Sequence, residues 1–210
     1  MSEHLIDAID DVLPQTQCRQ CGYNGCRNYA WAIAMGEAPI NRCAPGGQKG
    51  IEALAKVTGH EVIALDPEYG HEVPLELAHI NPDTCIGCRK CVAVCPTNAI
   101  LGAPKRLHGV ISDWCTGCAL CVTACPVDCI DMRPAPFEWT HEKALKARRL
   151  YREKLQREKL AYFRAVCCPK KFGISGSVSK KAPSWRPSPT PSGRVQVRFL
   201  SRKCAITSPL

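Results

Sequence analysis

Eight cysteines between residues 85 and 125 form two sets with the same internal spacing. Each set follows the pattern C-x2-C-x2-C-x3-C and is followed directly by a proline, Pro96 or Pro126. The members are Cys85, Cys88, Cys91 and Cys95 in the first set and Cys115, Cys118, Cys121 and Cys125 in the second. Thiolates bind zinc or iron–sulfur clusters in reducing compartments and form disulfides in oxidising ones. These eight cysteines are therefore expected either to bind metal or to form disulfides.

The spacing favours iron–sulfur clusters over both alternatives. A structural zinc site usually joins two C-x2-C pairs across a longer loop, and a third cysteine only three residues on would crowd the tetrahedron. The start of the chain has no basic-then-apolar signal peptide, so we expect a reducing cytoplasm and no disulfides. The pattern is that of bacterial two-cluster ferredoxins, in which cysteines of this spacing bind [4Fe–4S] clusters.

The ferredoxin pattern implies that the fourth cysteine of each set ligates the other cluster. One cluster, called cluster B, then takes Cys85, Cys88, Cys91 and Cys125, and cluster C takes Cys115, Cys118, Cys121 and Cys95. The third and fourth cysteines of a set are an i,i+4 pair, about 6 Å apart along a helix axis, which carries the fourth thiol away from its own set. Gly87 and Gly117 precede the second cysteine of each set, where the chain must turn sharply.

The segments after the two sets also match, with Cys95-Pro-Thr-Asn-Ala-Ile100 aligned on Cys125-Pro-Val-Asp-Cys-Ile130. We expect two copies of a short β–α–β unit about a pseudo-twofold axis, with strands in residues 98–101, 110–112 and 130–132. Cys129 aligns with Ala99, and we interpret it as a small buried hydrophobic residue. Five apolar side chains should separate the clusters from water, namely Val92, Val94, Ile100, Val122 and Ile130.

A third cysteine set lies near the N-terminus and has the spacing C-x2-C-x4-C-x16-C. Its members are Cys18, Cys21, Cys26 and Cys43. On spacing alone this set could hold zinc or a [4Fe–4S] cluster. Helices are expected around it at residues 2–13, 28–35 and 47–57, and residues 62–65 are a candidate extended segment.

The residues around this third set resemble a known family. The motif Cys18-Arg-Gln-Cys-Gly-Tyr-Asn-Gly-Cys26, followed by Tyr29-Ala30, Gly36-Glu37 and Cys43-Ala-Pro-Gly-Gly47, is similar to the small [4Fe–4S] domain in the B subunit of Rnf/Rsx-type ion-translocating electron transport complexes. The similarity runs from about residue 4 to residue 133. The resemblance implies that Cys18, Cys21, Cys26 and Cys43 bind a [4Fe–4S] cluster, called cluster A, for a total of three [4Fe–4S] clusters.

The same resemblance implies a function and partners. The clusters would relay single electrons between a soluble redox partner and a membrane-bound redox complex, whose other subunits would be the partners; no catalytic side chain is expected. Members of the family usually begin with a membrane-spanning helix, whereas this sequence begins at the soluble part, so we expect a soluble form without that helix. The expected location is the cytoplasm, either free or peripheral on the cytoplasmic face of the inner membrane.

Charge divides the 210 residues into two unlike parts. Residues 1–133 hold ten Lys/Arg and fifteen Asp/Glu, a balance of −5, whereas residues 134–210 hold eighteen and four, a balance of +14. Residues 141–166 are rich in helix formers, but their leucines recur every five residues and give no single apolar face, so we expect a solvated basic helix. Residues 167–210 hold no acid and much Pro and Ser, which is typical of a disordered tail, and Cys167, Cys168 and Cys204 match no ligand spacing.

The predicted fold class is α+β. The predicted parts are a small four-cysteine [4Fe–4S] domain (1–60), a linker (61–77), a two-cluster ferredoxin-type domain (78–133), a basic helix (134–166) and a basic Pro/Ser-rich tail (167–210). One alternative function is a free-standing soluble ferredoxin that serves a cytoplasmic reductase. The other is a nucleic-acid-binding protein with structural clusters, but the basic tail lacks interleaved aromatic residues, and no nucleic acid is expected.

Overall fold

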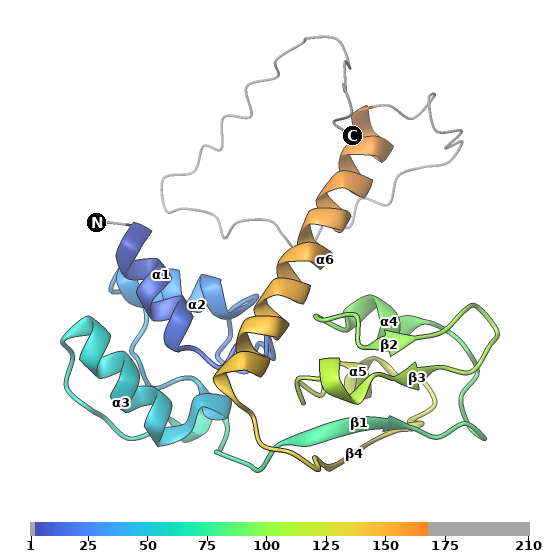
Figure 1. Ribbon diagram of the computed structural model, residues 1–210, viewed down its shortest axis with the longest axis horizontal. Helices are drawn as coiled ribbons and strands as arrows, with labels where there is room; N and C mark the ends of the chain where they lie inside the picture. Colours follow the sequence, from blue (N-terminus) through green and yellow to red (C-terminus); the bar gives the residue numbers. More distant parts are fainter. Residues whose placement is uncertain (1–2, 168–210) are drawn as a thin grey trace.

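The computed structural model describes residues 3–167, in which two groups of short elements flank one long helix (Figure 1). The helical module (residues 3–59) contains the first three α-helices, and the sheet module (residues 75–135) contains four strands and two short helices. The helices are α1 (Glu3–Val12), α2 (Cys26–Ala34), α3 (Gly47–Thr58), α4 (Lys90–Val94), α5 (Leu120–Ala124) and α6 (His141–Cys167). The mixture of helices and small sheets confirms the predicted α+β class. The predicted tail began at Cys167, which is the last residue of α6, and the rest of it, with Cys168 and Cys204, lies outside the described residues.

The helical module has its own apolar core. In α1 the apolar residues recur on one side of the helix, so that Ile9 is fully buried between α2 and α3. Ile51 and Leu54 of α3 complete the core at about 1 % exposure each. Tyr29 of α2 is equally buried, and its hydroxyl donates to the Pro39 carbonyl at 2.7 Å and accepts from the Arg42 amide at 3.0 Å. The three predicted helices are therefore confirmed, with ends displaced by up to two residues.

The sheet module consists of two antiparallel strand pairs. The outer strands β1 (Glu76–Ile80) and β4 (Ile130–Pro134) pair with Ile80 opposite Ile130, and the inner strands β2 (Ile100–Leu101) and β3 (Gly109–Val110) pair with Ile100 opposite Val110. The chain order is β1, α4, β2, then β3, α5, β4, so each half is a β–α–β unit and each strand pairs with a strand of the other half. This arrangement agrees with the expected internal repeat. Strand β1 was not among the predicted strands, because its pattern becomes evident only through its pairing with β4.

The connection between the modules differs from the prediction. Residues 62–65, the candidate extended segment, pair with no strand, and residues 60–66 form no regular element. A 3-10 turn, η2 (Pro67–Tyr69), follows, and Asp66 caps its N-terminus, since the Asp66 carboxylate accepts from the Glu68 amide at 3.0 Å.

The predicted solvated helix is wrong for the first half of α6. Three residues of its first turns, Ala144, Ala147 and Leu150, are buried at 3–8 % exposure, because the helix runs through the space between the two modules (Figure 1). Just before the helix, the Trp139 indole donates to the Pro14 carbonyl of the helical module at 2.9 Å. The second half of α6 extends beyond both modules. None of the helices in residues 3–167 is long and apolar enough to span a membrane.

Candidate metal centres

The four N-terminal cysteines surround one cavity in the helical module. Cys18, Cys21, Cys26 and Cys43 all line it, together with Leu13 and Tyr29. Cys26 is the first residue of α2, and Cys43 directly precedes the 3-10 turn η1 (Ala44–Gly46). The loop of residues 15–25 and the end of the segment after α2 thus bring together thiols that lie up to 25 positions apart.

A buried polar chain holds the loop that carries these cysteines. The Gln17 side chain accepts from the Cys26 amide at 2.9 Å and donates to the Gln15 side chain at 2.8 Å, which in turn donates to the Asp10 carboxylate at 2.9 Å. All three side chains are 1–3 % exposed, and both glutamines have φ angles of 57°. Since left-handed backbone is unfavourable for a residue with a Cβ, these bonds keep the loop in a strained conformation. The sequence does not predict this set of hydrogen-bonded side chains, because two glutamines beside a cysteine form no recognisable motif.

Burial favours the neutral form of two thiols of this cavity, Cys26 and Cys43. Desolvation raises the pKa of Cys43 to about 12 and raises the pKa of Cys26 well above its usual value. The nearby thiols act in the same direction, since a second negative charge would repel the first. The positive charge of a bound metal would favour the thiolate form of these two side chains, because it offsets the cost of burying a negative charge.

A second cavity lies in the sheet module and is also lined by four cysteines, Cys95, Cys115, Cys118 and Cys121. Three come from the second repeat, whereas Cys95 comes from the first, at the end of α4. Apolar side chains complete the wall, among them Ile100 and Met132. The Cys95 sulfur accepts from the Ala99 amide at 3.2 Å. The grouping is the one that the cross-ligation pattern predicts for cluster C.

The remaining four cysteines of the two sets, Cys85, Cys88, Cys91 and Cys125, line neither of these two cavities. Cys91 is buried, Cys85 and Cys125 are half-buried, and Cys88 is exposed. The Cys85 sulfur lies 3.5 Å from Nδ1 of the buried His108. The Cys125 sulfur lies 3.4 Å from that of Cys129, which is 5 % exposed. Cys129 is therefore buried as predicted, although its sulfur lies beside one of the predicted ligands. Within residues 3–167, no three His, Cys, Asp or Glu side chains converge closely enough to hold a single metal ion.

The loops before α4 and α5 have the same conformation. Gly87 and Gly117 have φ angles of 69° and 68°, and the residues that precede the helices, Arg89 and Ala119, are also left-handed at 62° and 56°. A Cβ on Gly87 would lie 2.6 Å from the Arg106 amide nitrogen, and one on Gly117 would lie 2.6 Å from the Glu76 carbonyl oxygen. Both glycines are therefore required by the turn and by close backbone packing.

The apolar residues predicted to exclude water are in the expected places. Ile100 and Ile130 are 3–4 % exposed. The valines of α4 and α5 are partly buried against the same core; they are Val92, Val94 and Val122.

A lysine of α6 reaches one of the cysteine loops. The Lys154 ammonium donates to the carbonyls of Ala93 and Cys95 at 2.8 and 2.7 Å, and the side chain is 12 % exposed. Burial lowers the pKa of Lys154, although Glu158, 3.7 Å away, acts in the opposite direction. This cation stabilises the C-terminal end of α4, where carbonyls lack partners. No pattern in the sequence links Lys154 to a segment 60 residues earlier.

Comparison with known proteins gives matches over both modules. A family described as "4Fe-4S dicluster domain" matches residues 78–132, which hold the eight regularly spaced cysteines of the sheet module and Cys129. A family described as "Putative Fe-S cluster" matches residues 13–45, which hold the four cysteines of the helical module.

Several curated proteins are similar over a longer part of the chain. A protein of Hahella chejuensis is 61 % identical over 132 residues, which are 63 % of this chain and 66 % of that protein. A protein of Azoarcus sp. is 56 % identical over 130 residues, 62 % of this chain and 71 % of its own length. One of Alkalilimnicola ehrlichii is 54 % identical over 136 residues, 64 % of this chain and 73 % of its own length. Each is named as the B subunit of an ion-translocating oxidoreductase complex. The matched part thus spans about two thirds of the length of these relatives.

Proposed function

Because the chain belongs to the family formed by the B subunits of ion-translocating oxidoreductase complexes, we propose that it relays single electrons through three [4Fe–4S] clusters. The three relatives named above share 54–61 % of its residues over the matched part. Cys18, Cys21, Cys26 and Cys43 bind cluster A. Cys85, Cys88, Cys91 and Cys125 bind cluster B, and Cys115, Cys118, Cys121 and Cys95 bind cluster C. These ligands occupy two domains (1–60 and 78–133) joined by the linker of residues 61–77.

One observation carries this proposal. Each of the two cavities is lined by four of the twelve cysteines and otherwise mainly by apolar groups. Four thiolates around an enclosed space are the donor set that a [4Fe–4S] cluster requires. The second cavity supports the crossed ligand set in particular, because Cys95 lines it beside three cysteines of the other repeat.

The clusters supply one-electron redox chemistry when they are bound. The protein's own residues ligate, orient and shield. The loop glycines let the backbone approach the ligand positions, and Gln15 and Gln17 fix the loop that bears Cys18 and Cys21. Ile100 and Ile130 exclude water from the sheet module.

The partners of this chain are, on this proposal, other subunits of a membrane-associated electron transport complex. Its relatives are named as subunits of an ion-translocating oxidoreductase complex. We place its site of action at the cytoplasmic face of the membrane that holds that complex. If native protein sediments with membranes and is released by salt, this placement is supported over that of a free-standing ferredoxin.

The test is a metal analysis of protein purified without oxygen, together with two serine variants. The unaltered protein should bind about twelve iron atoms and absorb broadly near 400 nm, with bleaching on reduction. Cys95→Ser should lose about four iron atoms, because Cys95 is a ligand of cluster C. The control, Cys129→Ser, changes a cysteine of similar burial that is not a ligand, and should keep all twelve. Stoichiometric zinc, or full iron content in Cys95→Ser, would contradict the proposal.

A further inference from the structure

The two repeats of the sheet module face different surroundings. The second repeat's loop, residues 115–118, faces the helical module, where the Thr116 hydroxyl donates to the Thr16 carbonyl at 2.9 Å. Thr116 lines the sheet-module cavity and Thr16 lines the helical-module cavity, so this bond joins the walls of the two proposed centres. The loop of residues 115–118, called the inward loop, is therefore in contact with another part of the same chain.

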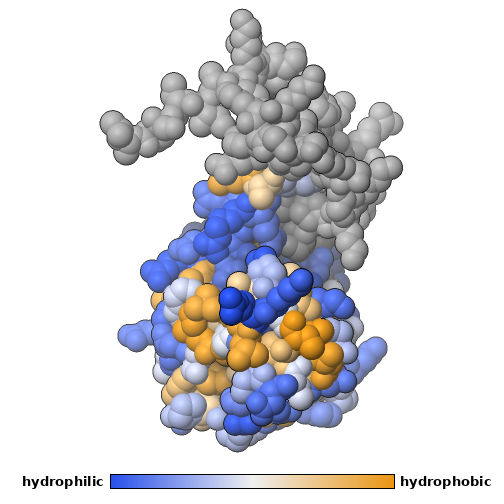
Figure 2. Space-filling view, turned by 90° about the vertical axis from the view of Figure 1, so that its right-hand side faces the viewer, coloured by the Kyte–Doolittle hydropathy of each residue, from blue (hydrophilic) through white to orange (hydrophobic). Residues whose placement is uncertain are grey.

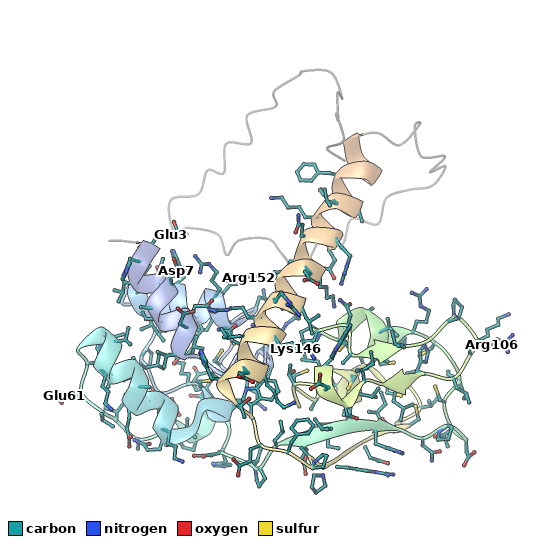
Figure 3. All side chains as sticks on the ribbon, viewed as in Figure 1. Glu3, Asp7, Glu61, Arg106, Lys146 and Arg152 are labelled. Carbon is teal, nitrogen blue, oxygen red and sulfur yellow. The ribbon has the colours of Figure 1, made fainter. Side chains whose placement is uncertain are left out.

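The first repeat's loop, residues 85–88, lies at the opposite end of the module. Of the twelve proposed ligands, all of which the structure describes, Cys88 alone is exposed. The loop between β2 and β3 folds onto this segment, with the Lys105 amide donating to the Gly87 carbonyl at 3.1 Å. That loop is the outermost part of the module, and Arg106 projects from its tip (Figure 3).

Exposed apolar and cationic side chains gather around Cys88. Ile86 and Leu107 are 57 % and 58 % exposed. Figure 2 looks onto this end of the molecule and shows strongly hydrophilic side chains among apolar ones. We call this surface the distal surface, and its residues are Ile86, Arg89, Lys90, Lys105, Arg106 and Leu107.

The charge of the distal surface is unlike that of the rest of the two modules. Residues 1–133 carry a net charge of −5, yet the stretch from Thr84 to Ser112 contains four Lys/Arg and no Asp or Glu. Within the described residues 3–167, none of these four cations forms an ion pair with a carboxylate. The internal repeat allows a direct comparison. Arg89 and Lys90, which follow the loop of residues 85–88, correspond to Ala119 and Leu120, which follow the loop of residues 115–118. The cations are therefore not required by the β–α–β unit itself.

We propose that the distal surface is the docking site for an acidic redox protein that exchanges electrons with the chain at the Cys88 end. The inference rests on the proposed function, because it assumes that Cys88 is a cluster ligand. Four unpaired cations around two apolar side chains complement an acidic face with an apolar centre, and such complementarity mainly accelerates association. Redox encounters use small interfaces, so a surface of six residues is of suitable size.

The experiment measures electron transfer from a reduced acidic flavodoxin, used as the probe, to the cluster-loaded full chain by stopped flow. Lys105→Gln/Arg106→Gln should lower the second-order rate constant about tenfold at low ionic strength, and the loss should disappear in about 0.5 M salt because exposed charges are screened there. The affinity for oxidised flavodoxin, which requires no electron transfer, should fall in parallel.

Two control variants remove the same charge elsewhere. Lys49→Gln/Lys56→Gln alters exposed cations of α3, and Arg149→Gln/Arg157→Gln alters exposed cations of α6. Both should keep the rate within twofold of the unaltered protein. Equal losses in either control, or an unchanged rate in Lys105→Gln/Arg106→Gln, would overturn the inference. Iron content is measured in every variant, so that absence of clusters, which would refute the proposed function, is distinguished from a failure of docking.

Discussion

At the scale of single residues, Gly87 and Gly59 have nearly the same backbone and very different surroundings. Their φ angles are 69° and 75°, but a Cβ on Gly87 would lie 2.6 Å from the Arg106 amide nitrogen, whereas one on Gly59 would meet nothing within 4 Å. Gly59→Ala therefore measures the left-handed backbone cost alone, about 1–2 kcal/mol.

Gly87→Ala should cost roughly 3 kcal/mol or more, because the collision with backbone adds to the same conformational cost. The displaced loop should also lose about four iron atoms, those of cluster B. Urea unfolding followed by absorbance near 400 nm, with iron analysis, checks both effects. Similar midpoints and full iron content in the two variants would show that the hairpin loop does not constrain the Cys85–Cys88 segment.

The cysteine sets are evident in the sequence, whereas the residues that support their loops are not. Cysteine sets are evident because a metal cluster imposes fixed spacing on residues close in the chain. Asp10 shows the opposite case. It is 1 % exposed, and its partners Arg148 and Arg152, at 3.4 and 3.3 Å, lie about 140 positions away. Such a contact depends on how the modules assemble, and no local pattern encodes it.

At the scale of elements, α6 shows why leucine spacing was a poor guide to its packing. The leucines recur every five residues and wind around the helix. The buried face consists instead of Ala144, Ala147 and Leu150, three residues apart, which lie on one side of a helix. Alanine is common on solvated helices too, so its presence did not indicate a buried face. Its small side chain lets α6 approach both modules closely.

Two leucines of α6 offer a matched test of this packing. Leu150 is 8 % exposed and lies in the docked half, whereas Leu160 is 49 % exposed and lies in the extended half. Leu150→Ala should lower the free energy of unfolding by about 2–3 kcal/mol, and Leu160→Ala by less than about 0.5 kcal/mol. Anaerobic urea unfolding of both variants makes the comparison. Equal effects would mean that the first half of α6 is as solvated as the second.

At the scale of the whole molecule, α6 contacts both modules through oppositely charged groups. Lys143 and Lys146 pair with Asp113 of the sheet module, and Arg148 pairs with Asp10 and Asp11 of the helical module (Figure 3 labels Lys146). These two lysines lower the pKa of Asp113 to about 2. The acidic part and the basic part of the sequence thus form ion pairs with each other within the chain. Composition predicted the charges, but the contact requires the turn at residues 135–140 that brings α6 back between the modules.

These ion pairs predict how firmly α6 is held. In Lys146→Gln/Arg148→Gln both modules lose one cationic partner on the helix, and amides of the docked half of α6 should exchange with solvent about tenfold faster. Arg149→Gln/Arg157→Gln removes the same charge from the same helix at exposed positions, and should change those rates less than twofold. Hydrogen exchange measured by mass spectrometry reports both. If the control variant accelerated exchange equally, the net charge of the helix, and not its contact with the modules, would set the protection of these amides from exchange. In that case α6 would not be the element that fixes the two cluster-bearing modules against each other.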